Sequence, residues 1–309
     1  MGRFRGSDAL LDIAFEGTYG TIPNGTGYTR VPFISSNLGA EQGLIEDDLL
    51  GMGREAQDPT DDVITNNGDL VVPVDAEAFG YWLKLFFGAP VTASGVHTFS
   101  SGASSLPSMT AQIGAPTVPN YEKNFGLRGN TMRIALSRRG LLNATLGLIG
   151  KGSTDAGTSS SGTPAGVTVS RFAQAVGEIK KDGSQLASIV EAEFTFSNNL
   201  DPVETIRPDS MIEDVDPGKA TVSGSITAKF ADTTLLTAAA SGAPMELSFG
   251  WAKGDDSLLF TLERVFLPRR AKKPVQGQGG VQATFNFQAS GADGHVLVAE
   301  LTNEVGSYA

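Results

Sequence analysis

Residues 68–90 constrain the fold more than any other part of the chain. The stretch opens with an alternating run at 70–74 that predicts a strand. Asp75 then stands at an N-cap position, since its carboxylate can accept free backbone N–H groups of the next turn. Large apolar residues follow at i, i+3, i+4, i+7 and i+8, on one helical face: Phe79, Trp82, Leu83, Phe86 and Phe87. Gly88 and Pro90 end the helix. We therefore expect a strand followed by a core helix at 75–87 that a large surface must cover.

The same order of features recurs in the second half of the chain. Residues 224–244 again give a glycine, an alternating strand, an aspartate cap at Asp232, a short helix at 233–241 and a terminating Gly-Ala-Pro. Upstream, Ser-Ser-Asn-Leu at 35–38 matches Ser-Asn-Asn-Leu at 197–200. A third Gly-Ala-Pro at 114–116 shows that this tripeptide alone carries little weight. The ordered set indicates two related domains.

Length and composition agree with two domains. The chain has 309 residues, of which 40% are hydrophobic and 17 are phenylalanine, enough for substantial cores. Residues 150–166 are nearly devoid of large apolar side chains, which marks the boundary. We predict an N-terminal domain at 1–157, a Ser/Gly/Thr-rich linker at 158–166 and a C-terminal domain at 167–309. The absence of cysteine excludes disulfides and thiolate metal sites.

Strand patterns dominate both halves, so the fold class is mainly β. In the first half we expect a strand at 28–35 and a hairpin of strands at 130–137 and 141–149, whereas 91–118 is polar and turn-rich. The second half offers more strands than the first: 175–180, 189–197, 220–230, 245–251, 258–265, 281–289 and 296–301. Between the strands at 28–35 and 70–74 lies a loop without sustained periodicity, of a length that is usually functional or disordered.

Charge is concentrated in three segments. Residues 41–62 hold eight acidic residues and one arginine, and residues 201–216 hold six acidic residues and one arginine. These net charges of −7 and −5 account for the −11 of the whole chain. Residues 264–273 carry five basic residues and no acid, and are most simply a solvated hairpin end. The acidic surplus disfavours DNA binding. As a hypothesis, the acidic loops of one subunit contact the basic segment of another.

Catalysis has little support in the sequence. His97 and His295 are the only histidines, both in turn-rich stretches that are typical of solvated residues, and no phosphate loop, zinc spacing or nucleophile elbow occurs. The acidic triplets Glu46-Asp47-Asp48 and Asp201/Glu204/Asp209 lack the glycine and terminal glutamate of a helix–loop–helix calcium site. We expect no enzyme, no cofactor and no metal. The N-terminal residues show no apolar export signal, and no apolar run is long enough for a membrane span.

Several short stretches resemble one known family. They are Gly-Arg-Phe-Arg-Gly at 2–6, Ile-Ala-Phe-Glu-Gly-Thr-Tyr-Gly-Thr-Ile-Pro at 13–23, the Ser-Asn-Asn-Leu at 197–200, and the segments 222–230 and 275–285. Together they resemble the major tail proteins (tail tube proteins) of long, non-contractile-tailed bacteriophages. The resemblance implies β-sandwich or barrel-like domains with one flanking helix each, here two in tandem, in a structural protein of the virion tail assembled in the bacterial host cytoplasm.

The resemblance also implies partners. Sheets join edge to edge around a ring, and rings stack into a tube through which the genome passes without specific DNA binding. Six tube domains per ring imply a trimer with pseudo-sixfold symmetry for a two-domain chain, or a hexamer if the repeat is not a duplication. Tape-measure, tail-tip and terminator proteins are implied at the ends. A β-rich secreted or surface binding module and a β-sandwich hydrolase remain as alternatives.

Stacking contacts are expected in an N-terminal arm at 1–20, the loops at 41–62 and 201–216, and the basic segment. The residues predicted to make ring-stacking and inter-subunit contacts are Arg3, Arg5, Phe15, Tyr19, Leu44, Ile45, Asp47, Asp48, Leu49, Arg54, Arg207, Glu213, Asp214, Arg269, Arg270, Lys272 and Lys273.

Overall fold

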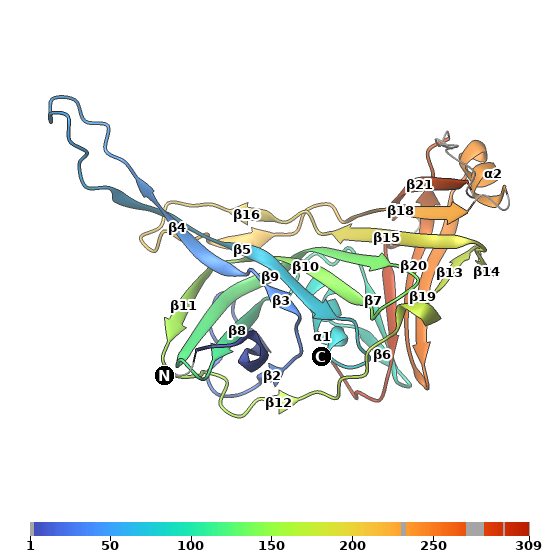
Figure 1. The fold of residues 1–309 in the computed structure, drawn as a ribbon, viewed down its shortest axis with the longest axis horizontal. Coiled ribbons are helices and arrows are strands. Elements are labelled where there is room, and N and C mark those ends of the chain that lie inside the picture. Colours follow the sequence, from blue (N-terminus) through green and yellow to red (C-terminus); the bar gives the residue numbers. More distant parts are fainter. Residues whose placement is uncertain (1–2, 230–232, 270–280, 293, 309) are drawn as a thin grey trace.

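A computed structural model describes residues 3–229, 233–269, 281–292 and 294–308. The fold is mainly β, as predicted, with two short α-helices. Figure 1 shows a strand-rich body from which one hairpin projects far to one side.

One sheet lies mostly within the first half of the chain. Its strands are β1 (Leu10–Phe15), β2 (Thr29–Arg30), β8 (Met109–Ala115), β9 (Asn120–Leu136), β11 (Gly152–Ala156) and β12 (Ala165–Gly166). Strand β1 pairs with β2 and β8, and β9 pairs with β8 and β11. A 3-10 turn, η1 (Gly6–Asp8), precedes β1. The expected strand at 28–35 is only partly present, as β2 and the two-residue β3, because Pro32 between them cannot donate to a ladder.

A second, longer sheet crosses from the first half into the second. It contains β3 (Ser35–Ser36), β4 (Gly39–Ile45), β5 (Thr60–Pro73), β10 (Asn143–Gly150), the end of β9, β15 (Ile189–Ser197), β18 (Thr221–Lys229) and β21 (Gln282–Ala289). The order β5–β10–β9–β15–β18–β21 is antiparallel throughout. The crossing point is the pairing of β9 with β15, from Thr131 with Ser197 to Leu136 with Ala192.

Further strands of this sheet follow from β20 (Asp256–Phe266), which pairs with β21. They are β6 (Val91–Ala93), β7 (Val96–Ser100), β13 (Glu178–Lys181), β14 (Ser184–Gln185), β19 (Met245–Lys253) and β22 (Val298–Thr302), with the 3-10 turn η2 (Gln174–Val176) before β13. Strand β20 pairs with β19, β21 and β22. Strand β22 also pairs with β7, so the end of the chain returns to the first half.

Helix α1 (Phe79–Phe87) forms as its sequence predicts, although it begins one turn later than expected. Asp75 Oδ1 accepts hydrogen bonds from the backbone N–H of Glu77 at 2.8 Å and of Ala78 at 2.7 Å, in the turn that leads into the helix. Gly88, with φ of 89°, ends it. The five predicted core residues Phe79, Trp82, Leu83, Phe86 and Phe87 are all buried. The two sheets cover the apolar helix face that these five residues form.

Helix α2 (Thr234–Ser241) occupies the position predicted for the second, smaller helix. Gly242, in the left-handed region at φ 66°, ends it. Only Leu235 and Ala239 are buried within it. The cap predicted at Asp232 lies outside the described residues.

The buried side chains of the two halves form one continuous core. The rings of Phe86 and Phe87 on α1 lie 6.4 and 4.7 Å from that of Phe196 on β15. Near the C-terminus, Tyr308 covers Gly80 so closely that a Cβ there would overlap its ring. The predicted boundary at 158–166 therefore does not separate two independent cores.

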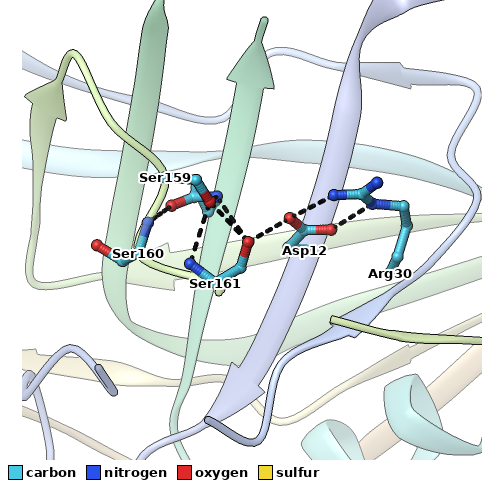
Figure 2. Close-up of polar contacts among 6 residues, drawn as sticks. Asp12, Arg30, Ser159, Ser160 and Ser161 are labelled. Carbon is cyan, nitrogen blue, oxygen red and sulfur yellow. Dashed lines mark hydrogen bonds and ion pairs between the residues drawn. The ribbon is translucent and has the colours of Figure 1, made fainter. Parts of the chain in front are cut away.

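The predicted linker at 158–166 is packed against the first sheet, not extended between domains (Figure 2). Asp12, buried on β1, accepts hydrogen bonds from Arg30 at 2.7 Å and from Ser161 Oγ at 2.7 Å. Gln112 on β8 donates a hydrogen bond to Ser159 Oγ at 2.8 Å and accepts one from the backbone N–H of Ser160 at 2.7 Å. The serines of the predicted Ser/Gly/Thr-rich linker thus satisfy buried polar groups.

Two further expectations differ from the structure. The polar stretch at 91–118 contains β6, β7 and β8, whose short apolar runs are interrupted by buried polar residues such as Thr110 and Gln112. The expected irregular loop at 41–62 has an ordered stem, because β4 pairs with β5 from Gly39 with Asn67 to Ile45 with Thr60.

Candidate assembly surfaces

The β4–β5 hairpin is the most exposed element of the molecule (Figure 1). Its end, residues 44–63, presents apolar side chains to solvent: Leu44 is 64% exposed, Leu49 63% and Leu50 97%, and Ile45 and Met52 are also exposed. Asp47, Asp48 and Arg54 lie among them and are exposed. Asp47 Oδ1 accepts the N–H of Leu49 at 3.0 Å, which shapes the tip. Exposed apolar residues in such a row indicate a surface that another molecule covers.

The second acidic loop lies along the base of this hairpin. Strands β16 (Asp201–Val203) and β17 (Asp214–Asp216) pair to form its stem. The N–H of Ile64 on β5 donates to Ser210 O at 2.9 Å, which fixes the loop to the hairpin. Arg207 forms an ion pair with Asp209 at 3.1 Å within the loop, and Glu213 is exposed and accepts from Thr205. Both acidic segments therefore lie at one end of the long sheet.

Three of the predicted contact residues are engaged within the chain. Lys84 lies over the ring of half-buried Phe15, 4.2 Å from its centroid. Arg128 lies over the ring of Tyr19 and forms an ion pair of 2.9 Å with Asp214. Burial raises the pKa of the Tyr19 hydroxyl above its usual range, with nearby Asp214 adding to the shift. Phe15, Tyr19 and Asp214 thus connect the start of the chain to its own body.

The other predicted residues are placed as follows. Arg3 and Arg5 are exposed ahead of β1. Arg269 is exposed after β20, with its guanidinium beside Gly242 at the end of α2. Arg270, Lys272 and Lys273 lie outside the described residues. Tyr19 of the arm packs beside the second acidic loop, whereas Arg269 forms no ion pair with either acidic loop among the described residues.

His97 does not match its expected solvated setting, whereas His295 is exposed in a turn, as expected. His97 on β7 is fully buried, and its ring nitrogens lie 2.8 Å from Thr92 Oγ1 and 3.0 Å from Asn303 Oδ1. His295 Nδ1 lies 2.7 Å from Ser101 O. These contacts connect the C-terminal region to β6 and β7. The partners of the two rings are a threonine hydroxyl, an amide oxygen and a backbone carbonyl, and no carboxylate is bonded to either ring among the described residues.

Among the described residues, no three acidic or histidine side chains gather as a metal site would require. No helix in the described part of the chain is long and apolar enough to cross a membrane.

The hairpin predicted between the strands at 130–137 and 141–149 is present, and its turn lies at the opposite end of the long sheet, although its arginines were not singled out as a contact surface. Residues 137–140 connect β9 to β10, and Arg138 and Arg139 there are both exposed. A groove of about 830 Å³ lies beside Arg138, between the end of β9 and the strands β13, β14 and β15. The adjacent arginines Arg138 and Arg139 are visible in the sequence, but only the register of the sheet shows that they lie at the end opposite the acidic loops.

Comparison with known families gives one result. The family model described as phage tail tube protein matches residues 6–289 of this chain. No curated protein matches this chain.

Proposed function

This chain belongs to the phage tail tube protein family and is a structural protein of the virion tail, and on that premise we propose that it self-assembles into stacked rings that form the conduit for genome delivery. Assembly in the bacterial host cytoplasm is part of this proposal. Tape-measure, tail-tip and terminator proteins are the partners expected at the ends of the tube, and DNA passes through it without specific binding.

We propose further that the chain contains two tandem tube domains that arose by duplication. The strand pairings of the two halves support this. The first half has the pairings β1–β8, β8–β9, β9–β10, β10–β5, β5–β3 and β9–β11. The second half has β13–β19, β19–β20, β20–β21, β21–β18, β18–β15 and β20–β22. Each pairing in one set has a counterpart at the same place in the other, with α1 and α2 also in matching positions.

The close backbone contacts of the two halves support the same correspondence. Gly68 lies against the backbone of Asn37 and Leu38, where a Cβ would come within 2.7 Å of Leu38 Cα. Gly218 lies in the same way against the carbonyl of Asn199. The counterpart of Gly68 in the second half is therefore Gly218, six residues before the Gly224 that the sequence repeat indicates.

The observation that carries the ring proposal is the junction of β9 with β15. If the halves are equivalent, this pairing joins the last edge of one domain to the first edge of the next. The corresponding first edge of the chain, along β3, pairs only with β5 among the described strands. The corresponding last edge follows β20, which ends at Phe266. If the same strand pairing repeats between neighbouring chains, the unpaired backbone groups of both edges are satisfied. Three chains then supply the six domains of a closed ring. A ring of six chains is the alternative.

Electron microscopy of the purified protein tests the assembly. We expect rings or hollow tubes, formed spontaneously or after seeding with isolated tail tips, since a tube subunit can wait for an initiator. A protein that remains monomeric at high concentration and after seeding would contradict the proposed function.

A further inference from the structure

We propose that the basic turn at 137–140 and the groove beside it receive the acidic tip of the β4–β5 hairpin from a second copy of this chain. The inference rests on the proposed function and deepens it, because it names the surface on which the hairpin of one subunit docks in a stack.

The register of the long sheet places the two surfaces at opposite ends of the same strands. Strand β5 begins at Thr60, which pairs with Ile45 of the hairpin, and ends at Pro73, which pairs with Asn143. The turn at 137–140 immediately precedes Asn143 and follows the end of β9. The hairpin tip thus extends beyond one end of the sheet, and the basic turn closes the other end.

The receiving surface is unoccupied within the chain. Arg138 and Arg139 are exposed, and neither forms an ion pair with any described residue. The groove of about 830 Å³ is lined by apolar residues such as Leu136, Ile179 and Ile189, by several polar residues, by Arg138 and Lys229, and by one acid, Glu191. A partly apolar lining with two cations and one carboxylate fits an acidic segment that carries apolar side chains.

The hairpin tip has this complementary composition. Residues 46–58 contain five acidic residues and one arginine, a net charge of −4. Leu49, Leu50 and Met52 lie between these charges and are 63%, 97% and 56% exposed. Side chains this exposed contribute nothing to the fold of the free chain. Their burial in the groove of another copy would remove apolar surface from water and pair the flanking carboxylates with Arg138 and Arg139.

A chain cannot fill its own groove. The hairpin tip and the strands β13 and β14 lie at opposite ends of the longest axis of the molecule (Figure 1). Contact therefore joins different surfaces of two copies, and such head-to-tail contacts repeat without limit unless they close. An open series of this kind is what stacking along a tube requires.

The second half carries its acidic loop at the same end of the sheet as the first half. Its acidic loop, between β16 and β17, lies at the end where β15 finishes and β18 begins, next to the pairing of Ser197 with Thr221. Strand β20 ends at Phe266, which pairs with Gln288, and the Arg269 guanidinium lies beside Gly242 after α2. The acidic loops of both halves thus lie at the same end of the sheet.

Site-directed disulfide cross-linking tests the contact, since the chain has no cysteine of its own. The variant combines Leu50→Cys at the tip with Ala175→Cys, an exposed residue that lines the groove. Assembled under mild oxidation, it should give a ladder of covalent multimers on a denaturing gel. The matched control combines Leu50→Cys with Ala93→Cys, an exposed alanine on β6 away from the groove, and should give no ladder.

The outcomes separate this inference from the proposed function. Tubes that form without a ladder, or with equal ladders from both cysteine pairs, would overturn the docking surface and leave the tube function standing. The absence of both tubes and ladder would overturn both.

Charge reversal provides a second readout. Arg138→Glu with Arg139→Glu should abolish tube formation, and adding Asp47→Lys with Asp48→Lys should restore it. Lys253→Glu, on the exposed β19–β20 turn, should leave assembly unchanged. Normal assembly of the Arg138/Arg139 variant in a folded protein, or failure of the swap to restore it, would contradict the contact.

Discussion

Asp75 shows how a single carboxylate can organise the start of the main helix at a cost in stability. It is completely buried, one oxygen accepts two backbone N–H groups, and the other has no partner in the described structure. Burial raises its pKa to about 6, although the two hydrogen bonds and Arg171 oppose the shift. The folded protein therefore holds this proton more tightly than the unfolded chain.

The pH dependence of unfolding follows from this shift. The contribution of Asp75 to stability is fully present below about pH 4 and is lost as the pH rises through about 6. Between pH 4 and 7 the unfolding free energy of the wild type should fall by about 2–3 kcal/mol relative to Asp75→Asn. Denaturant titrations at several pH values measure this difference. Asp48→Asn, at the exposed tip, is the control and should show no such trend, and parallel curves for wild type and Asp75→Asn would contradict the shift.

At the scale of elements, helix α1 is the part of the fold that local sequence determines best. Its apolar face and its terminating glycine were recognisable and are found in the structure, whereas Asp75 bonds the turn before the helix and Ala78 occupies the N-cap position. Its partners were not predictable, because Phe196 on β15 is more than a hundred residues away and reaches α1 only through the pairing of β9 with β15.

Truncation of the helix face should be strongly destabilising. Phe86 on α1 is completely buried against β15, so Phe86→Ala should lower the unfolding free energy by about 3–5 kcal/mol. Thermal or chemical denaturation measures the loss. Leu44→Ala, at an exposed hairpin position, serves as the comparison and should change stability by no more than about 0.5 kcal/mol. Equal effects would show that α1 is not the centre of the core.

The segment at 158–166 should behave as part of the first sheet. Ser161→Ala removes one donor from buried Asp12 and leaves Arg30, so we expect a loss of about 1–2 kcal/mol. Ser7→Ala, whose hydroxyl bonds Asp8 at the surface, should be neutral. Proteolysis gives a second measure: rapid cleavage of the native protein within 158–166 would contradict the packed arrangement.

At the scale of the whole molecule, sequence reasoning identified the class of fold and the acidic loops but not how the parts connect. The strands at 189–197, 245–251 and 281–289 were found from alternation, whereas β6 and β7 were overlooked because they are short and His97 interrupts the apolar pattern. The serines at 159–161 were interpreted as a linker, since nothing local shows that Asp12 and Gln112 need their hydroxyl and backbone donors. Side chains that satisfy distant buried groups cannot be recognised from their neighbours in sequence.

The hairpin should be needed for assembly and not for folding. Replacing residues 46–58 with a short Gly-Ser linker removes exposed side chains and the partly buried Gln57 and leaves the β4–β5 stem in place, so the melting temperature should be nearly unchanged. Tube formation, observed by light scattering and electron microscopy, should be lost. Tubes that still form would show that stacking does not use the hairpin.

The number of chains in the smallest closed ring tests the account most directly, because it depends on the two halves being equivalent domains. Native mass spectrometry of rings released from tubes measures it. Three chains of 32.2 kDa each are expected, with six domains around the ring. A ring of six chains would contradict the duplication, since each chain would then supply a single unit of the sixfold arrangement.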